Sequence, residues 1–288
     1  MNGILLINKP KDYTSRDIVN IISKKFNTKK VGHTGTLDPL ATGLLVLCLG
    51  NHLKIAELLT SDTKEYIAKI TLGIETDTLD ITGNILKEEY NNDYSIDTIK
   101  KTLNSFIGTI EQQVPAYSAI KVNGKKLYEY ARENIKIDLP TRTVEIYNIE
   151  LLDIPNVVEN HLEFTIKCRV SKGTYIRSLV RDIGKKLNTV ATMKELTRIK
   201  QGNISLDNAY TLEDIDNNNY KLLNMKDILD IKKITIDNEL LPKIKNGQIL
   251  PKFFKEDKIL ILDSKNNPLG IYETYEKDTT KCKPWKMF

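Results

Sequence analysis

A single carboxylate, Asp38, stands in the stretch GHTGTLDPLATGLLVLCLG (residues 32–50), among glycines and directly before an unbroken apolar run. Glycine permits positive φ and the close approach of another molecule, and an Asp-Pro pair favours a turn. The stretch therefore predicts a shaped loop that enters a buried element, where an acid can carry chemistry. The residues alone favour the plainer interpretation, in which Asp38 is a turn or capping aspartate. A glycosidase would need two carboxylates across the scissile bond, and this loop offers one.

A second acid, Asp80, competes for the same role because it also ends a Thr-Leu-Asp triplet. It lies in the acidic stretch GIETDTLDITG (residues 73–83). This composition favours a solvated turn, with weak metal binding as a remote alternative, because the EF-hand spacing is not met. Asp38 differs in that Gly35 and Gly43 flank it and a lysine-rich helix end precedes it.

Several other chemistries lack their sequence signatures. The chain has no GxxxxGK[ST] and no GxGxxG, so a nucleotide-phosphate cradle is poorly supported. With three histidines and no CxxC or HExxH spacing, a zinc site has no support either. The three cysteines, Cys48, Cys168 and Cys282, are far apart and odd in number, which suits reduced thiols.

The bulk composition is that of an ordinary globular protein. The 288 residues are 40% hydrophobic and 28% charged, and no apolar run approaches the ~20 residues of a membrane helix. The opening MNGILLINKP lacks the pattern of a secretory signal, so we expect a cytoplasmic protein. A net charge of +5 is compatible with a polyanionic partner without requiring one.

The elements that must position these residues alternate between helix and strand. TSRDIVNIISKKF predicts an amphipathic helix whose start is specified by Thr14 and Asp17 in capping-box spacing. KEYIAKITLG predicts a strand with Tyr66 on its apolar face, and a short helix is expected over 52–59. KILILDSKNNPLGIYETYE predicts a hairpin. We expect two domains, 1–231 and a small β-rich module at 232–288.

Six stretches taken together, in this order, resemble the TruB-type tRNA pseudouridine synthases: LLINKP, GHTGTLDPLATGLLVLCLG, KEY, LGIETDTLDITG, VPAYSAIKVNGKKLYEYAR and VSKGTYIRSLVRDIG. The resemblance runs from about residue 2 to residue 205. It implies an isomerase that converts uridine 55 in the T-arm of tRNA to pseudouridine, without cofactor or metal. The fold it implies is α+β, a mixed and largely antiparallel sheet flanked by helices, followed by a PUA-like module. It also implies tRNA as the partner, with no membrane and no obligatory protein partner.

The resemblance assigns roles to six residues. It makes Asp38 the nucleophile, attacking either the sugar carbon or the pyrimidine ring, and Arg177 the guanidinium that keeps it ionised. Tyr66 lies against the target base and is a candidate for handling the C5 proton, although periodicity alone makes it a core aromatic. The remaining matches are a second pocket tyrosine, an apolar wall of the uracil site and a residue that fills the stack vacated by the flipped base: Tyr175, Leu196 and His33.

Basic residues beside these motifs are predicted contacts to the RNA backbone, because lysine-rich loops and helix ends neutralise phosphate without selecting sequence. For any one of them a solvated surface is the simpler interpretation. The predicted set is Lys9, Lys24, Lys25, Lys29, Lys30, Lys121, Lys125, Lys126 and Arg142. The polar insertion 115–142 corresponds to the family's mobile RNA-gripping segment.

The sequence departs from the family pattern at several positions. Asp12 stands where glycine is usual, and the usual Leu-Arg-Arg-Thr run is Leu196-Thr197-Arg198-Ile199, with Ile204 where phenylalanine is common. Two alternatives to a stand-alone isomerase remain open at this stage. One is a protein that binds and remodels tRNA without turnover, and the other is a guide-RNA-dependent pseudouridylase.

Overall fold

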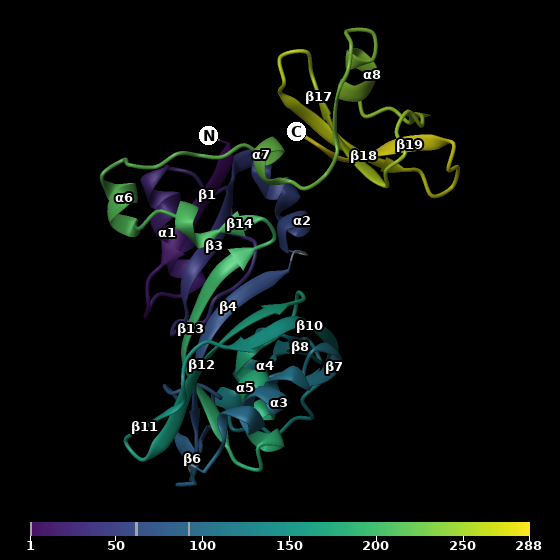
Figure 1. Ribbon diagram of the computed structural model, residues 1–288. Helices are drawn as coiled ribbons and strands as arrows, with labels where there is room; N and C mark the ends of the chain where they lie inside the picture. Colours follow the sequence, from purple (N-terminus) through teal and green to yellow (C-terminus); the bar gives the residue numbers. More distant parts are fainter. Residues whose placement is uncertain (1, 61–62, 92) are drawn as a thin grey trace.

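The computed structural model describes residues 2–60, 63–91 and 93–288. Its main feature is a ten-stranded sheet in the order β1-β3-β13-β4-β12-β10-β7, with β2, β14 and β11 as short additions (Figure 1). All its strand pairs are antiparallel except β3 with β13. The bounds are β1 Gly3–Lys9, β2 Val31–His33, β3 Thr42–Leu49, β4 Lys64–Leu72, β7 Gly108–Gln113, β10 Thr141–Leu151, β11 Asn156–Val158, β12 His161–Val170, β13 Ala191–Gln201 and β14 Ile204–Ser205.

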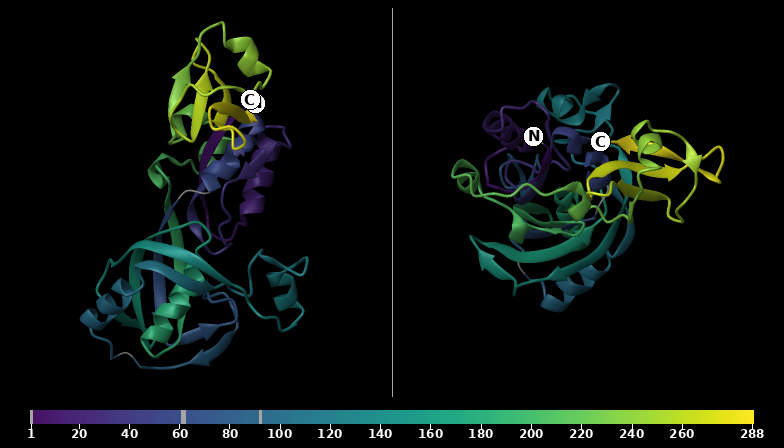
Figure 2. Two further views of the ribbon diagram at one scale, coloured as in Figure 1. Left: turned by 90° about the vertical axis from the view of Figure 1, so that its right-hand side faces the viewer. Right: turned by 90° about the horizontal axis from the view of Figure 1, so that it is seen from above.

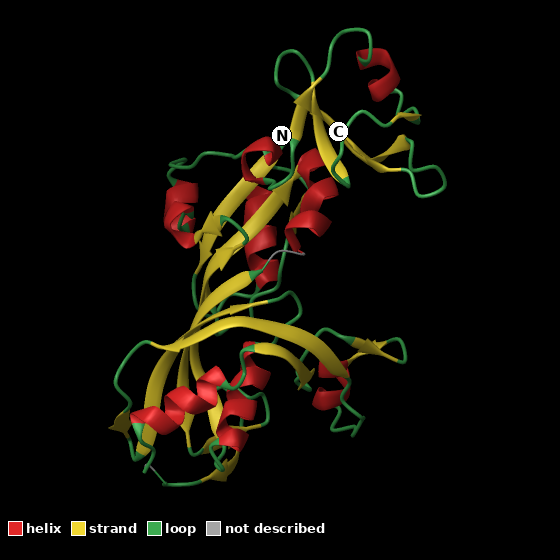
Figure 3. Ribbon diagram, turned by 45° about the vertical axis from the view of Figure 1, so that its right-hand side comes forward, coloured by secondary structure: helices red, strands yellow, loops and turns green. Residues whose placement is uncertain are grey.

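Helices pack on this sheet through their apolar faces. Helix α3 (Ile96–Asn104) packs against β10 and helix α5 (Ile176–Lys186) chiefly against β13, and the two helices also contact each other (Figure 3). Helix α1 (Ser15–Lys25) lies by β2 at the other half and begins with the predicted capping box of Thr14 and Asp17. The predicted helix over 52–59 is instead a 3-10 helix, η1 (Gly50–Ile55), followed by the short α2 (Ala56–Thr60).

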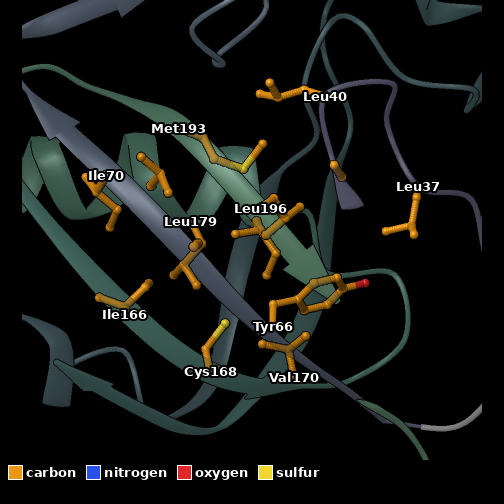
Figure 4. Packing of buried hydrophobic residues seen from close by; sticks show 14 of the residues in the cluster. Leu37, Leu40, Tyr66, Ile70, Ile166, Cys168, Val170, Leu179, Met193 and Leu196 are labelled. Carbon is orange, nitrogen blue, oxygen red and sulfur yellow. The ribbon is translucent and has the colours of Figure 1, made fainter. Parts of the chain in front are cut away.

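The core of the large sheet follows the predicted alternation. Tyr66, Ala68, Ile70 and Leu72 of β4 all point to one face and are buried. Figure 4 shows this face packed against residues of β12, β13 and α5, with the ring of Tyr66 at its edge. A strand with one apolar face therefore carries Tyr66 to the boundary between the core and the loop of Asp38.

Smaller elements extend from the sheet. β5 (Ile74–Thr76) pairs with β6 (Ile85–Glu88) around the stretch that holds Asp80. A projecting segment carries β8 (Lys121–Val122), β9 (Lys125–Lys126) and α4 (Leu127–Arg132), and Figure 2 shows it standing away from the lower part of the molecule. After β14 the chain forms η2 (Leu206–Asn208), α6 (Leu212–Asp216) and α7 (Met225–Ile228).

The C-terminal residues form a second sheet of five strands in the order β15-β17-β18-β19-β16, drawn in green to yellow in Figure 1. The bounds are β15 Lys233–Thr235, α8 Leu241–Lys245, β16 Leu250–Pro251, β17 Lys258–Leu262, β18 Pro268–Thr274 and β19 Lys281–Met287. The predicted hairpin is confirmed as β17 and β18. One apolar cluster joins Leu260 and Ile271 of this sheet to Ile4 and Leu44 of the large one.

These observations confirm the α+β class with a largely antiparallel sheet flanked by helices and a small β-rich C-terminal module. Cys48, Cys168 and Cys282 are free thiols, each of them buried. Within the described residues, no helix has the length and apolar character needed to cross a membrane.

Candidate active site

A cleft of about 1370 Å³ lies where the loop after β2, strands β4 and β13, the first turn of α5 and the segment with α4 meet. Each of these parts comes from a different region of the chain, so the cleft exists only in the folded protein. It brings together all six residues that the resemblance assigns to the site, namely Asp38, Tyr66, Tyr175, Arg177, Leu196 and His33.

The centre of the cleft is an ion pair between Asp38 and Arg177. Nε of Arg177 lies 2.8 Å from Oδ2 of Asp38, and Nη2 donates to Oδ1 at 3.1 Å. The guanidinium also donates to the carbonyls of Thr78 (2.8 Å) and Tyr117 (3.0 Å). The Arg177 side chain is 5% exposed and the Asp38 side chain 34%. A buried cation therefore holds a carboxylate that still reaches the cleft.

The loop that presents Asp38 is fixed from the N-terminal side. The Ser15 hydroxyl donates to the Leu37 carbonyl and accepts from its amide. The backbone of Asp12 takes φ +68 and donates to the Pro39 carbonyl, so the aspartate adopts the left-handed conformation that the usual glycine would favour. This turn leads into α1, which begins at the same Ser15.

Lys9 belongs to this support and not to the RNA surface. Its side chain is fully buried, and Nζ donates to the carbonyls of Pro10 (2.8 Å), Tyr13 (2.7 Å) and Pro39 (3.3 Å). The prediction that Lys9 contacts phosphate is therefore wrong, because the ammonium is enclosed by backbone acceptors. The sequence did not indicate this burial, which depends on the pairing of Lys9 with Gly43 across β1 and β3.

The interpretation of Asp80 as a solvated turn residue is also wrong. Asp80 is 6% exposed, lines the same cleft and has Oδ2 4.0 Å from Nε of Arg177. Its Oδ1 accepts from the hydroxyls of Thr78 and Thr82 and from the Thr82 amide. These bonds hold Oδ1 and leave Oδ2 toward Arg177, so the two Thr-Leu-Asp acids share one guanidinium.

The walls beside the ion pair are aromatic and apolar. Tyr66 and Leu196 are 8% and 7% exposed, and Figure 4 shows the Tyr66 hydroxyl directed out of the core toward the loop of Leu37. Burial raises the pKa of Tyr66, and the neighbouring Arg198 guanidinium opposes this shift. Tyr175 precedes α5, and its backbone amide and carbonyl are both bonded to the side chain of Gln112. The side chains of Tyr66, Tyr175 and Leu196 thus line the cleft with surfaces against which a flat ring can lie.

His33 stands at the rim, at the end of β2. Burial lowers its pKa, and the cations of Arg198 and Arg16 act in the same direction, so the neutral ring is favoured. An uncharged imidazole at the mouth of the cleft has the size and flatness to take the place of a nucleobase in a stack.

The lysines and the arginine predicted to contact the RNA backbone differ in where they lie. Lys126 and Arg142 line the cleft, whereas Lys24, Lys29, Lys30 and Lys121 are exposed outside its lining. Lys25 donates to the Asp216 carbonyl, and Lys125 forms an ion pair with Glu133. Five further cations line the cleft and were not predicted to bind RNA, although each lies within or beside one of the quoted motifs. They are Arg16, Lys64, Arg132, Lys172 and Arg198.

The possible metal ligands of the described residues are too scattered to form a site. In residues 2–60, 63–91 and 93–288 no group of three or more His, Cys, Asp or Glu side chains is placed to hold a metal ion. What the cleft offers is two carboxylates beside one guanidinium, a buried phenol, apolar side chains and several lysines and arginines, an arrangement suited to covalent chemistry on a nucleotide.

Comparison with known proteins matches most of the chain. The model of the TruB family pseudouridylate synthase N-terminal domain matches residues 23–176, and that of the tRNA pseudouridylate synthase B C-terminal domain matches residues 177–242. A tRNA pseudouridine synthase B of Clostridium tetani is 44% identical over 92% of this chain and 96% of its own length. One of Bacillus pumilus is 40% identical over 100% of this chain and 97% of its own.

Solved structures share the fold. An H/ACA ribonucleoprotein bound to a substrate RNA containing 2'-deoxyuridine contains a chain that superposes with a TM-score of 0.73 at 23% identity, covering 99% of this chain and 84% of that one. A Cbf5-Nop10-Gar1 complex gives a TM-score of 0.70 at 24% identity, covering 99% and 83%. At this level of identity the likeness concerns the fold alone.

Proposed function

The chain belongs to the TruB family of pseudouridylate synthases, and from this premise we propose that it isomerises uridine 55 in the T-arm of tRNA to pseudouridine. It is an isomerase with tRNA as substrate, as its relatives named tRNA pseudouridine synthase B are. The observation that carries the proposal is the placement of Asp38 at the centre of the cleft, paired with Arg177.

Pseudouridine formation requires a nucleophile and a pocket that holds the detached base, and the cleft contains residues suited to both. The bond between N1 and C1' breaks, the uracil turns, C5 joins C1', the C5 proton leaves and N1 gains a proton. Asp38 is the nucleophile in this proposal, toward either the sugar or the ring, because it reaches the cleft and is paired with the buried guanidinium of Arg177. The walls of Leu196 and Tyr175 keep the detached base in place while the bond is open.

The remaining roles follow from position. Tyr66 lies deep in the cleft and accepts the C5 proton after the base has rejoined the sugar. The target base must leave its stack to reach Asp38, at a few kcal/mol for unstacking. His33 at the rim fills the vacated place, and the cations along the cleft, Lys126 and Arg142 among them, hold the RNA backbone.

The same proposal covers the organisation of the chain. The catalytic domain is 1–231 and the PUA-like module 232–288, since the second sheet begins with β15 at Lys233. The insertion 115–142 grips RNA through the segment with α4. The exposed lysines outside the cleft, such as Lys24 and Lys30, remain proposed contacts of a tRNA larger than the cleft. The protein acts in the cytoplasm, where tRNA is, and needs no partner chain.

A map of pseudouridine in one unmodified T-arm stem-loop, incubated with this protein alone, tests the proposal. We expect one new pseudouridine, at the position of uridine 55, with the wild type and none with Asp38→Asn. Binding without modification would support a tRNA-remodelling protein instead. Modification that required an added guide RNA would identify a guide-dependent enzyme and contradict a stand-alone synthase.

A further inference from the structure

Arg198 is a buried cation that lines the cleft and takes no part in the reaction steps proposed above. It is 1% exposed and is the largest of the fully buried side chains. It lies toward the end of β13, between two neighbouring strands. Its register partners are Tyr66 on β4 and Gly43 on β3. A charge this deep in a sheet needs partners on several sides.

Backbone carbonyls on either side of the Asp38 loop hold the guanidinium. Nε donates to the Leu44 carbonyl at 2.7 Å and Nη2 to the Gly35 carbonyl at 3.1 Å. Nη1 lies 3.2 Å from the point where a Cβ on Gly35 would stand, so the loop closes tightly on the cation. The orientation of Arg198 is therefore fixed by the same loop that presents the nucleophile.

Tyr66 lies opposite Arg198 in the register of β4 and β13, and both residues line the cleft. Burial, the largest effect, raises the pKa of the Tyr66 phenol, and Cys168 from β12 and Asp38 from the loop act in the same direction. The Arg198 guanidinium, which carries a positive charge and only hydrogen-bond donors, acts against them and lowers the pKa of this phenol.

We propose that Arg198 is a positioning residue that prepares the Tyr66 oxygen to take the C5 proton, an inference that rests on the proposed function. In that step the C5–H bond breaks and its electron pair forms the C5–C6 double bond. The C6–N1 π pair becomes the bond from N1 to a proton supplied by water. To accept the C5 proton, the Tyr66 phenol first gives its own proton to solvent, and the positive charge of Arg198 favours that loss. The C5 proton then passes to the phenolate oxygen.

Single-turnover rates of pseudouridine formation, measured from neutral to alkaline pH, test this role. Arg198→Gln removes the charge, so we expect a rate at neutral pH at least about tenfold below wild type. The loss should shrink as pH rises, because hydroxide then supplies the phenolate that the guanidinium had favoured. Arg198→Lys, which keeps a cation, should have a rate between those of the wild type and Arg198→Gln. Arg169→Gln, the same change at an exposed arginine on β12, should behave as wild type.

An isotope effect separates this role from a purely structural one. With deuterium at C5 of the target uridine, Arg198→Gln should show a larger isotope effect than wild type, because proton removal has become slower. A rate loss that is equal at all pH values, with an unchanged isotope effect, would overturn the proposal.

A second variant covers the case in which Arg198→Gln does not fold, as judged by circular dichroism. Gly35→Ala keeps the cation but displaces it, and should reproduce both the pH-dependent loss and the isotope effect in weaker form. A Gly35→Ala enzyme with the wild-type isotope effect would contradict the proposal. If the wild type itself makes no pseudouridine, the proposed function fails. If the wild type is active and the variants keep its profile, only the role of Arg198 fails.

Discussion

At the residue scale, the charges of the site meet at the guanidinium of Arg177. It contacts both oxygens of Asp38 and two backbone carbonyls, and Asp80 approaches its Nε from another side. Two carboxylates on one buried guanidinium share its charge, and the half-exposed Asp38 is the one that substrate can reach. We therefore expect Asp80 to act on Asp38 through the cation, as a positioning residue.

Asp80→Asn tests this arrangement, since it removes the charge and keeps the size of the side chain. We expect the rate of the chemical step to fall about tenfold or more, with little change in tRNA affinity, because Arg177 is then free to shift from Asp38. Single-turnover rates and filter binding measure the two effects. Asp77→Asn, the same change in the same loop but outside the cleft lining, serves as the control. Equal rates for both variants would remove Asp80 from the mechanism.

Lys9→Met tests the support of the Asp38 loop. Three carbonyls lose their donor, so we expect unfolding free energy to fall by about 2 to 4 kcal/mol. Urea denaturation measures it, with the exposed Lys11→Met as control. Salt dependence of tRNA binding should stay as in wild type, whereas a reduced dependence would return Lys9 to the RNA surface.

The site residues differ in how far the sequence could place them. Asp38 and Arg177 could be paired because each lies in a long motif with a family resemblance. Lys9 and Asp80 were misplaced because their burial depends on long-range pairing, of Lys9 with Gly43 and of Asp80 with Met193. A lysine beside a proline and an aspartate in an acidic stretch have the local composition of exposed turns, whatever their tertiary surroundings.

At the scale of elements, the parallel contact between β3 and β13 brings the nucleophile loop to the rest of the cleft. Gly43 pairs with Arg198 in this contact and has φ +97, and a Cβ there would lie 2.4 Å from the Arg198 carbonyl. The glycine after the Asp38 turn is thus required both by conformation and by close approach. Any side chain at this position would separate the loop from Arg198 and Tyr66.

Gly43→Ala should therefore lose more than about 3 kcal/mol of stability and nearly all activity. Gly108 has a similar φ of +111 with nothing within 4 Å of its Cβ position, so Gly108→Ala isolates the cost of the backbone angle, about 1 to 3 kcal/mol. Thermal unfolding of the two variants gives the comparison. Equal losses would show that the contact with β13 contributes nothing.

Local signals account for the elements that were predicted well. The capping box of α1 and the one-sided apolar pattern of β4 are encoded within about ten residues and were both confirmed. The 3-10 geometry of η1 and the parallel pairing of β13 with β3 were not predicted. Strand order in a ten-stranded sheet depends on contacts between residues far apart in the sequence, which periodicity does not report.

At the scale of the whole molecule, several lysine and arginine side chains line one cleft although the net charge of the chain is only +5. The loop of Asp38 forms one wall of this cleft and the projecting segment with α4 another, so RNA held between them meets the ion pair. Phosphate contacts of this kind position a substrate and weaken with salt.

Arg142→Gln should lower the slope of log affinity for tRNA against log salt by about 0.7 to 0.9, the value for one phosphate contact. Its effect on the chemical step at saturating tRNA should be small. Lys101→Gln, at an exposed lysine on α3 outside the cleft lining, is the control and should leave the slope unchanged. A normal slope in Arg142→Gln would remove this residue from the RNA-binding surface.

Release of tritium from C5 of uridine 55 tests whether Asp38 is the nucleophile. The hydrogen at C5 leaves only when the base has been detached and rejoined. With equal tRNA binding confirmed for each protein, the wild type should release one tritium per pseudouridine and Asp38→Asn none, while Asp80→Asn should release it slowly. Tritium release by Asp38→Asn at the wild-type rate would show that the carboxylate held by Arg177 is not the nucleophile.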